Sequence, residues 1–331
     1  MRVAVLGGTG FTGRAVVESL LASGHEPLVV HRGESEPAGF PDVPHLHVER
    51  AALPAAASDL REFAPEAAVD CFAMSRADAE SALAALPPGI HVVVLSSIDV
   101  YRAFGALQAG VVTDPVPISE DAPLRAERHP YRGSRSAELG DLDADSYEKL
   151  EVEEAYLPRG GTVLRLPFVY GEHDARCREE LILRRLRAGR HRIPFGPGTF
   201  LGSRVYVADV AAAVVLALES PLARGEVMNL AERHTLPVRL WAERLIALAE
   251  ADAELVDVPE YGLPPDIADW SSGSMQPLLI DSGKARSLLG WRDSDPDESL
   301  VRSVSWHLAN PPAGADSDWR ADDAALELAR T

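Results

Sequence analysis

The segment 7–13 has the sequence GGTGFTG, and it lies between a short apolar run and a helical pattern. Glycines at this spacing allow a tight turn, let a phosphate group approach bare backbone, and let a helix pack closely against a strand. The first turn of a helix also presents free N–H groups and a positive dipole end to an anion. The chemistry that this spacing favours is the binding of a dinucleotide pyrophosphate. The expected contacts are Gly7, Gly10, Phe11, Thr12 and Gly13.

A second position that bears on the same ligand follows the next apolar run. A carboxylate at the end of the second strand accepts a hydrogen bond from the ribose 2′-OH of NAD, whereas an arginine suits the 2′-phosphate of NADP. This chain has His31 and Arg32 there, and its first acid is Glu34. The sequence therefore favours NADP, with NAD as the alternative, and we expect His31 and Arg32 to contact the cofactor. The competing interpretation of Arg32 is a solvated loop arginine.

The elements that must position these residues alternate along the chain between strands and helices. Such alternation predicts βαβ units and a parallel sheet with right-handed crossovers, an α/β fold of the Rossmann type with a doubly wound sheet. Strands are expected at 2–6, 27–30, 46–48, 67–72, 90–95, 162–166, 204–207 and 225–230. Helices are expected at 14–23, 77–86, 147–157, 176–187, 208–218 and 239–249.

The pattern also predicts a division of the chain into two parts. Residues 1–172 form the dinucleotide-binding domain, to which 203–230 return, and 173–202 with 231–310 form a smaller C-terminal substrate-binding subdomain. Residues 311–331 are rich in acids, Ala and Pro, and we expect a poorly ordered or surface-lying tail. The segment 101–146 has no sustained period, and loops of that length usually serve as lids or binding segments.

The charge balance of the 331 residues excludes several partners. Lys and Arg number 32 against 51 Asp and Glu, a net charge of −19, whereas nucleic acids and anionic membranes attract basic proteins. The two cysteines, Cys71 and Cys177, lie far apart without a CxxC motif, so we expect no disulfide and no metal site. Nothing resembles a signal peptide or a membrane span of about 20 apolar residues. We expect a cytoplasmic protein with a small-molecule substrate, and a homodimer stays open.

Several further segments resemble the extended or atypical branch of the short-chain dehydrogenase/reductase superfamily, the NAD-dependent epimerase/dehydratase-like proteins. Together with the glycine turn they span nearly the whole chain. The resemblance implies the Rossmann fold and an NAD(P)-dependent epimerase, dehydratase or reductase. The matching segments are LSSIDVY at 95–101, LRLPFVYG at 164–171, RVYVADV at 204–210, VMNL at 227–230 and DSGKARSLLGW at 281–291.

The resemblance also implies site residues. The family's catalytic serine or threonine after the fifth strand matches Ser97, and its backbone contacts to the cofactor match Ala73 and Met74. The family's lysine matches Lys149, with Glu153 one helical turn later. In the family this lysine holds the nicotinamide ribose and lowers the pKa of a tyrosine four residues before it, so that the phenol exchanges a proton near neutral pH.

The tyrosine position departs from the family pattern, because Asp145 occupies it and Tyr147 lies only two residues before Lys149. On a regular helix, residues two apart do not face each other. Asp145 with Glu148 also matches a capping box, which would start the helix near residue 146. Three interpretations stay open: Tyr147 swings in as proton donor, Asp145 faces Lys149 as a base, or the pair is broken and redox chemistry is lost or done by other groups.

Two other residues bear on the reaction. Asp99 lies two residues after Ser97, where the family's sugar dehydratases carry acid/base carboxylates, so it is a candidate for proton transfer. The alternative is that Asp99 caps the turn after the fifth strand. Phe168 stands where the family has a substrate-contacting asparagine, which indicates a more apolar pocket and disfavours nucleotide-sugar chemistry.

Three functions follow from these residues. The first is an NAD(P)-dependent oxidoreductase or epimerase/dehydratase acting on a small polar or sugar-like molecule, with Ser97, Tyr147, Lys149 and Asp99 as the catalytic set. The second is a lyase or isomerase without net redox change, with Asp99 or Asp145 as base. The third is a non-catalytic NADP-binding sensor.

Overall fold

Seven parallel strands form the central sheet of the computed structural model, in the order β10-β6-β5-β4-β1-β2-β3. Their order reverses between β1 and β4, and ligands of open parallel sheets bind at the carboxyl ends of the strands beside such a reversal. The strands are β1 (Arg2–Leu6), β2 (Glu26–His31), β3 (His45–His47), β4 (Ala67–Asp70), β5 (His91–Ser97), β6 (Thr162–Leu166) and β10 (Val227–Asn229). The structure describes residues 1–34, 36–37, 39–133, 143–271, 273, 276–312 and 318–329.

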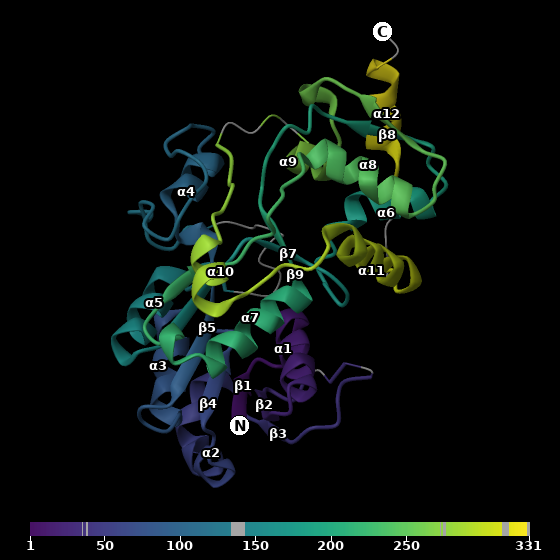
Figure 1. Ribbon diagram of the computed structural model, residues 1–331. Coiled ribbons are helices and arrows are strands. Elements are labelled where there is room, and N and C mark those ends of the chain that lie inside the picture. The colour runs from purple at the N-terminus through teal and green to yellow at the C-terminus, as the bar shows by residue number, and fades with distance from the viewer. Residues whose placement is uncertain are drawn as a thin grey trace.

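Helices cover both faces of this sheet, which confirms the Rossmann-type α/β fold (Figure 1). Successive side chains of a strand point to opposite faces. Val3 and Val5 of β1 accordingly pack in one apolar core, and Ala4 and Leu6 pack in another. The first core includes α1 (Phe11–Ala22) and α7 (Val207–Glu219), and the second includes α3 (Arg76–Ala85) and α5 (Lys149–Tyr156).

The C-terminal half adds a second body at the top of Figure 1. It contains a two-stranded parallel sheet and shares a third apolar core with the segment after β5. Another short parallel pair, β7 with β9, lies between the two bodies (Figure 1). The elements are β7 (Phe168–Tyr170), α6 (Glu180–Arg187), β8 (Arg192–Phe195), β9 (Arg204–Tyr206), α8 (Val238–Leu248), β11 (Glu254–Asp257), α9 (Pro265–Ser271), α11 (Pro296–Ala309) and α12 (Arg320–Leu328).

Three shorter helices complete the described chain, and two of them correct the sequence analysis. Helix α4 (Arg102–Gln108) lies in the segment 101–146, for which no element is predicted. Helix α10 (Gly283–Leu289) falls in the predicted substrate subdomain but contacts α7 and β10 on the large sheet. Helix α2 (Ala57–Phe63) follows a 3-10 turn at Arg50–Ala56.

Residues 318–329 of the predicted poorly ordered or surface-lying tail include helix α12, most of whose residues are exposed or half-buried, so this part of the tail is ordered and lies on the surface. Helix α12 docks on the C-terminal body because Asp322 and Arg185, both buried, form two hydrogen bonds of 2.8 Å. An acid-rich composition predicts a solvated tail, but it does not reveal that one acid meets a buried arginine.

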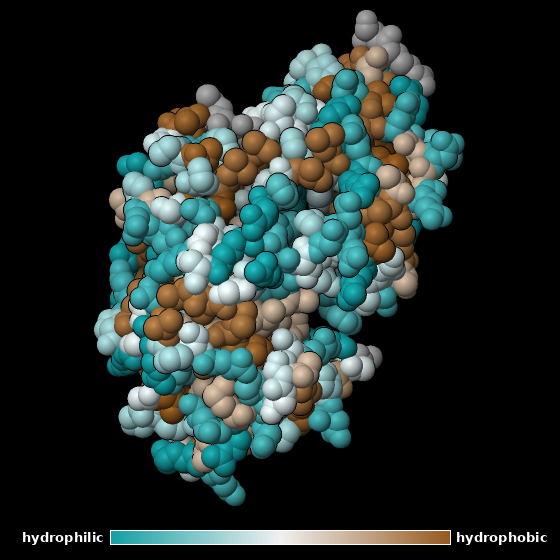
Figure 2. Space-filling view, viewed as in Figure 1, coloured by the Kyte–Doolittle hydropathy of each residue, from teal (hydrophilic) through white to brown (hydrophobic). Residues whose placement is uncertain are grey.

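The visible surface carries hydrophobic residues in separate groups among hydrophilic ones (Figure 2). Within the described ranges, no helix is both long enough and apolar enough to cross a membrane.

Candidate active site

The glycine turn connects β1 to α1 at the reversal of strand order. Gly7 has a φ of +77°, and a Cβ on it would lie 2.6 Å from the Cβ of Phe72. A Cβ on Gly13 would lie 2.2 Å from the carbonyl oxygen of Gly7. The nearest atom to a Cβ on Gly10 is 3.8 Å away. Two glycines are therefore required for the turn and the helix packing, while Gly10 leaves room for an approaching ligand.

The amino end of α1 is available to an anion. Its N-cap, Gly10, makes no side-chain capping hydrogen bond, so the first N–H groups of the helix point toward the turn. A cavity of about 460 Å³ opens there. Backbone donors, a helix dipole and open space fit a dinucleotide pyrophosphate. The cavity is lined by Thr9, Gly10, Phe11 and Arg14 on the sheet side and by His173, Asp174, Trp306 and His307 from the C-terminal half.

At the end of β2, the two predicted cofactor contacts, His31 and Arg32, differ in their exposure to solvent. His31 is buried, and its Nε2 lies 2.8 Å from Nδ1 of His45 on β3. Burial lowers the pKa of His31, and the neighbouring His45 and His47 lower it further. Arg32 is 62% exposed, and its guanidinium lies 3.3 Å from Glu34.

Lys149 is buried at the carboxyl ends of β4 and β5. Its Nζ donates hydrogen bonds to the carbonyl oxygens of Ala73 at 2.7 Å and Leu95 at 3.1 Å. An ammonium has three N–H donors. Two of them are used by these partners among the described residues, so the third can bind a ligand hydroxyl. Burial lowers the pKa of Lys149, and the charge of Asp99 opposes that shift. The lysine suits the ribose-holding role that the family resemblance implies.

Tyr147 is buried beside Ser97 and Asp99. Its phenol donates a hydrogen bond of 2.7 Å to Oδ2 of Asp99. Burial and the Asp99 charge raise the pKa of Tyr147 well above its ordinary value, and a hydrogen bond with Ser97 acts in the opposite direction. The Ser97 hydroxyl also accepts the Asp99 N–H at 3.2 Å. The structure thus places the hydroxyls of Ser97 and Tyr147 and the carboxylate of Asp99 at one point.

The backbone before α5 explains how Tyr147 reaches this point. Helix α5 begins at Lys149, and its N-cap is Glu148, whose φ of −160° and ψ of 94° are extended. In extended backbone, residues two apart project to the same side. Tyr147 and Lys149 flank such a residue, so the rule for residues within a helix does not apply to them. The predicted capping box on Asp145 is wrong.

Glu148 holds this extended turn in place. Its carboxylate accepts two hydrogen bonds from the guanidinium of Arg125, and also the N–H groups of His129 at 2.6 Å and Leu150 at 2.9 Å. These donors lower the pKa of Glu148 despite its burial. Arg125 also donates to the carbonyl oxygen of Asp99 at 3.0 Å. One buried ion pair therefore ties the turn after β5 to the start of α5.

Asp99 is buried, and this raises its pKa. Its Oδ1 has no hydrogen-bond partner within the described part of the chain. The ring of Tyr131 packs edge-on against Tyr147, 5.1 Å between centroids, with its hydroxyl 3.5 Å from Asp99. The turn after β5 is capped by Ser97, so the capping interpretation of Asp99 is wrong.

Asp145 is exposed, and its carboxylate accepts the N–H of Gly133 at 3.0 Å. Lys149 instead donates hydrogen bonds to backbone carbonyl oxygens, so the interpretation of Asp145 as a base facing Lys149 is wrong. Sequence reasoning missed Arg125 and Tyr131, because both lie in the segment 101–146, where no periodicity marks a buried residue.

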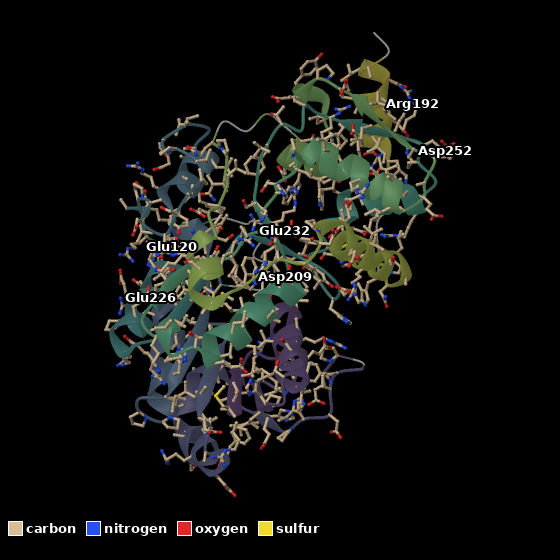
Figure 3. The ribbon with its side chains drawn as sticks, viewed as in Figure 1. Glu120, Arg192, Asp209, Glu226, Glu232 and Asp252 are labelled. Atoms are coloured by element: carbon tan, nitrogen blue, oxygen red, sulfur yellow. The ribbon has the colours of Figure 1, made fainter. Side chains whose placement is uncertain are left out.

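Two further features line the junction of the bodies. Phe168 packs edge-on against Trp270, 5.6 Å between centroids, and the guanidinium of Arg178 lies 5.2 Å from the Phe168 ring. Glu232 lies between the two bodies (Figure 3). Burial raises its pKa to about 7, and a hydrogen bond with Tyr170 opposes the shift. No sequence signal singles out Glu232.

The fold and this site define a dinucleotide-dependent α/β enzyme of the short-chain dehydrogenase/reductase type. The model of the NAD dependent epimerase/dehydratase family matches residues 3–103 and 92–231. The chain therefore belongs to the NAD-dependent epimerase/dehydratase family, whose members are epimerases, dehydratases and reductases.

Individual relatives agree with this assignment. The chain is 29% identical over 278 residues to 2′-dehydrokanamycin reductase of Streptomyces kanamyceticus, which covers 83% of this chain and 72% of that protein. Its fold is similar to UDP-glucose 4-epimerase of Thermotoga maritima, with a TM-score of 0.69, 20% identity, and 92% and 98% of the two chains covered. It is equally similar to dTDP-glucose 4,6-dehydratase of Bacillus anthracis, with a TM-score of 0.69, 18% identity, and 94% and 97% covered.

Proposed function

We propose that the protein is an NADP-dependent reductase of a ketone on a small sugar-like molecule, with Tyr147 as the proton donor. The observation that carries this proposal is the hydrogen-bonded group of Ser97, Tyr147 and Asp99 beside Lys149, which forms although the tyrosine is displaced in sequence.

The roles of the residues follow from these contacts. A reduced nicotinamide, when bound, supplies the hydride for the carbonyl carbon. The hydroxyls of Ser97 and Tyr147 meet the carbonyl oxygen, and the Tyr147 proton goes to that oxygen. Asp99 accepts a hydrogen bond from the phenol at 2.7 Å, and its buried carboxyl group is placed to return a proton to Tyr147 after the transfer. Lys149 keeps one donor for the ribose, and its charge stabilises the phenolate that forms.

The choice of NADP rests on the end of β2. Positions 31–33 carry no carboxylate to accept the 2′-OH of NAD, and the exposed Arg32 can exchange its contact with Glu34 for a 2′-phosphate. We expect the replacement Arg32→Ala to remove a preference for NADPH over NADH in fluorescence titrations. A preference that survives the replacement refutes this assignment.

The substrate class rests on the reductase relative and on the aromatic wall at Phe168. The relative's name, 2′-dehydrokanamycin reductase, describes the reduction of 2′-dehydrokanamycin. Phe168, which packs against Trp270, stands where the family has a substrate-contacting asparagine, and this disfavours a nucleotide sugar. We therefore propose a sugar ketone that carries no nucleotide.

The test measures NADPH consumption with 2′-dehydrokanamycin as one probe and a dTDP-linked 4-keto sugar as the other. We expect turnover of the first and little of the second. The replacement Tyr147→Phe is expected to lower kcat by about 10²- to 10⁴-fold, the usual contribution of a general acid, while NADPH still binds. The matched control is Tyr261→Phe, because Tyr261 is 85% exposed.

Full turnover by the Tyr147→Phe variant overturns the proposed role of this tyrosine. Conversion of substrate without net NADPH consumption, abolished by Asp99→Asn, favours the isomerase or lyase alternative. The observation in favour of that alternative is the buried carboxylate of Asp99, whose Oδ1 has no hydrogen-bond partner among the described residues.

A further inference from the structure

Three histidines gather at the outer edge of the sheet, on β2 and β3. The two strands are parallel, and His31 is the register partner of His47. His45 lies two residues before His47, so both point to the same face of β3. Glu36, in the connection between the strands, places Oε1 3.0 Å from Nε2 of His47. The strand pairing thus brings three imidazoles and one carboxylate together.

The distances within this cluster suit one small cation. Oε1 of Glu36 lies 3.9 Å from Nε2 of His31 and 3.8 Å from Nδ1 of His45, and these two nitrogens are 2.8 Å apart. All four ligand atoms lie within 4.8 Å of one another. Tetrahedral zinc with bonds of about 2.0–2.1 Å requires about 3.3 Å between ligands, which falls inside this range. Modest side-chain movements bring the four atoms to that spacing.

We propose that His31, His45, His47 and Glu36 form a binding site for a divalent transition-metal ion such as Zn²⁺. The absence of a CxxC motif does not bear on this site, because its ligands are imidazoles and a carboxylate. The proposal is independent of the proposed reductase function.

The position of the cluster next to Arg32 raises the alternative of a 2′-phosphate ligand. The carboxylate of Glu36 repels a phosphate but offsets half of the charge of a divalent cation. Three imidazoles and one carboxylate therefore favour the metal ion.

Metal binding has a local consequence at the turn after β2. The N–H of Gly33 points at Nδ1 of His31 at 3.3 Å. An imidazole that binds a metal through Nε2 carries its proton on Nδ1, so this N–H must turn away. Gly33 has a φ of +90° and lacks a side chain, which lets its peptide rotate. Occupancy of the site therefore changes the backbone next to Arg32.

The test uses the full-length, untagged protein after treatment with a chelator and dialysis. Zn²⁺ is titrated in competition with a chromophoric chelator, and Co²⁺ is added separately to record its visible spectrum. We expect one tight site per chain and a Co²⁺ spectrum typical of tetrahedral coordination. The replacements His45→Ala and His47→Ala are each expected to weaken Zn²⁺ binding at least about 100-fold, because the loss of an outer-shell partner alone costs about 10- to 100-fold.

Two controls locate the site. His234→Ala removes an exposed histidine outside the cluster and should leave Zn²⁺ binding unchanged. Cys177→Ser tests the second group of potential ligands, Cys177 with Glu179 and His307, and should also leave it unchanged. Circular dichroism confirms that each variant is folded.

Three outcomes overturn the proposal: no stoichiometric Zn²⁺ binding by the parent protein, tight binding that survives both histidine replacements, or loss of binding in Cys177→Ser. If the parent protein binds no Zn²⁺ and the replacement His47→Ala lowers the affinity for NADPH, the cluster is assigned to the 2′-phosphate instead.

Discussion

The replacement Arg125→Met tests whether the buried ion pair with Glu148 holds the active-site turn. The side chains of Arg125 and Glu148 are 3% and 0% exposed. Methionine fills part of the volume of arginine but supplies no donor, so the Glu148 carboxylate keeps two backbone N–H groups and loses its counter-charge. Removing one partner of a buried pair costs about 3–5 kcal/mol, because the remaining charge is uncompensated.

A loss of that size lowers the unfolding midpoint by about 6–10 °C, at roughly 2 °C per kcal/mol for a long chain. The assay is chemical and thermal denaturation followed by circular dichroism. The matched control is Arg128→Met, three residues away. Arg128 pairs with Glu154 at 2.7 Å, but both side chains are more than 40% exposed, and such surface pairs contribute about 1 kcal/mol or less.

The pH dependence of stability gives a second readout. In the parent protein the pKa of Glu148 is lowered, so its ion pair stabilises the fold above the ordinary pKa of a glutamate and loses that effect as pH falls through the lowered pKa. In Arg125→Met the buried carboxylate has no cation, which raises its pKa. The destabilisation is therefore present at neutral pH and diminishes as the carboxyl is protonated.

A double replacement, Arg125→Met with Glu148→Gln, completes the test. Since it removes the uncompensated charge, it should cost less than the sum of the single replacements. Equal losses for Arg125→Met and Arg128→Met, or a stability difference that does not narrow on acidification, would refute this account of the turn.

Three further outcomes are expected, with stability measured by denaturation at constant protein concentration and dinucleotide binding by fluorescence titration. Gly13→Ala should abolish dinucleotide binding and destabilise the fold, because the new Cβ would lie 2.2 Å from a backbone oxygen. The control Gly105→Ala, where the Cβ meets open space, should stabilise α4 by about 0.5–1 kcal/mol. Asp322→Ala should cost about 3 kcal/mol, the lower end for a broken buried pair, since a second carboxylate still pairs with Arg185. Asp99→Asn should raise stability at neutral pH, because burial raises the pKa of Asp99, and the gain should vanish below about pH 4, where the unfolded carboxyl is also protonated.

The sequence alone determined the sheet and its ligand-binding edge. The apolar runs at 2–6 and 90–95 predict strands, and the structure has β1 and β5 there. The glycines at 7, 10 and 13 predict the turn into α1, and the close approaches at Gly7 and Gly13 leave no space for a side chain there. These signals come from residues close together in the chain, so a short stretch of sequence is enough to recognise them.

The geometry of the catalytic residues was decided by tertiary structure. Counting residues on a helix separates Tyr147 from Lys149, yet Glu148 adopts extended backbone because its buried carboxylate pairs with Arg125, 23 residues earlier. That pairing leaves no periodic trace in the segment 101–146. The docking of α12 depends likewise on the contact between Asp322 and Arg185, 137 residues apart.

The difference between the two kinds of feature is physical. Propensity, periodicity and glycine backbone freedom act within a few residues, so the sequence by itself determined the Rossmann fold and the glycine turn, and the family resemblance implied Ser97 and Lys149 as site positions. Which buried charge meets which partner depends on the three-dimensional path of the chain. Tertiary structure alone therefore decided that Tyr147 reaches Asp99, that Asp145 stays in solvent, and that the register of β2 with β3 gathers three histidines.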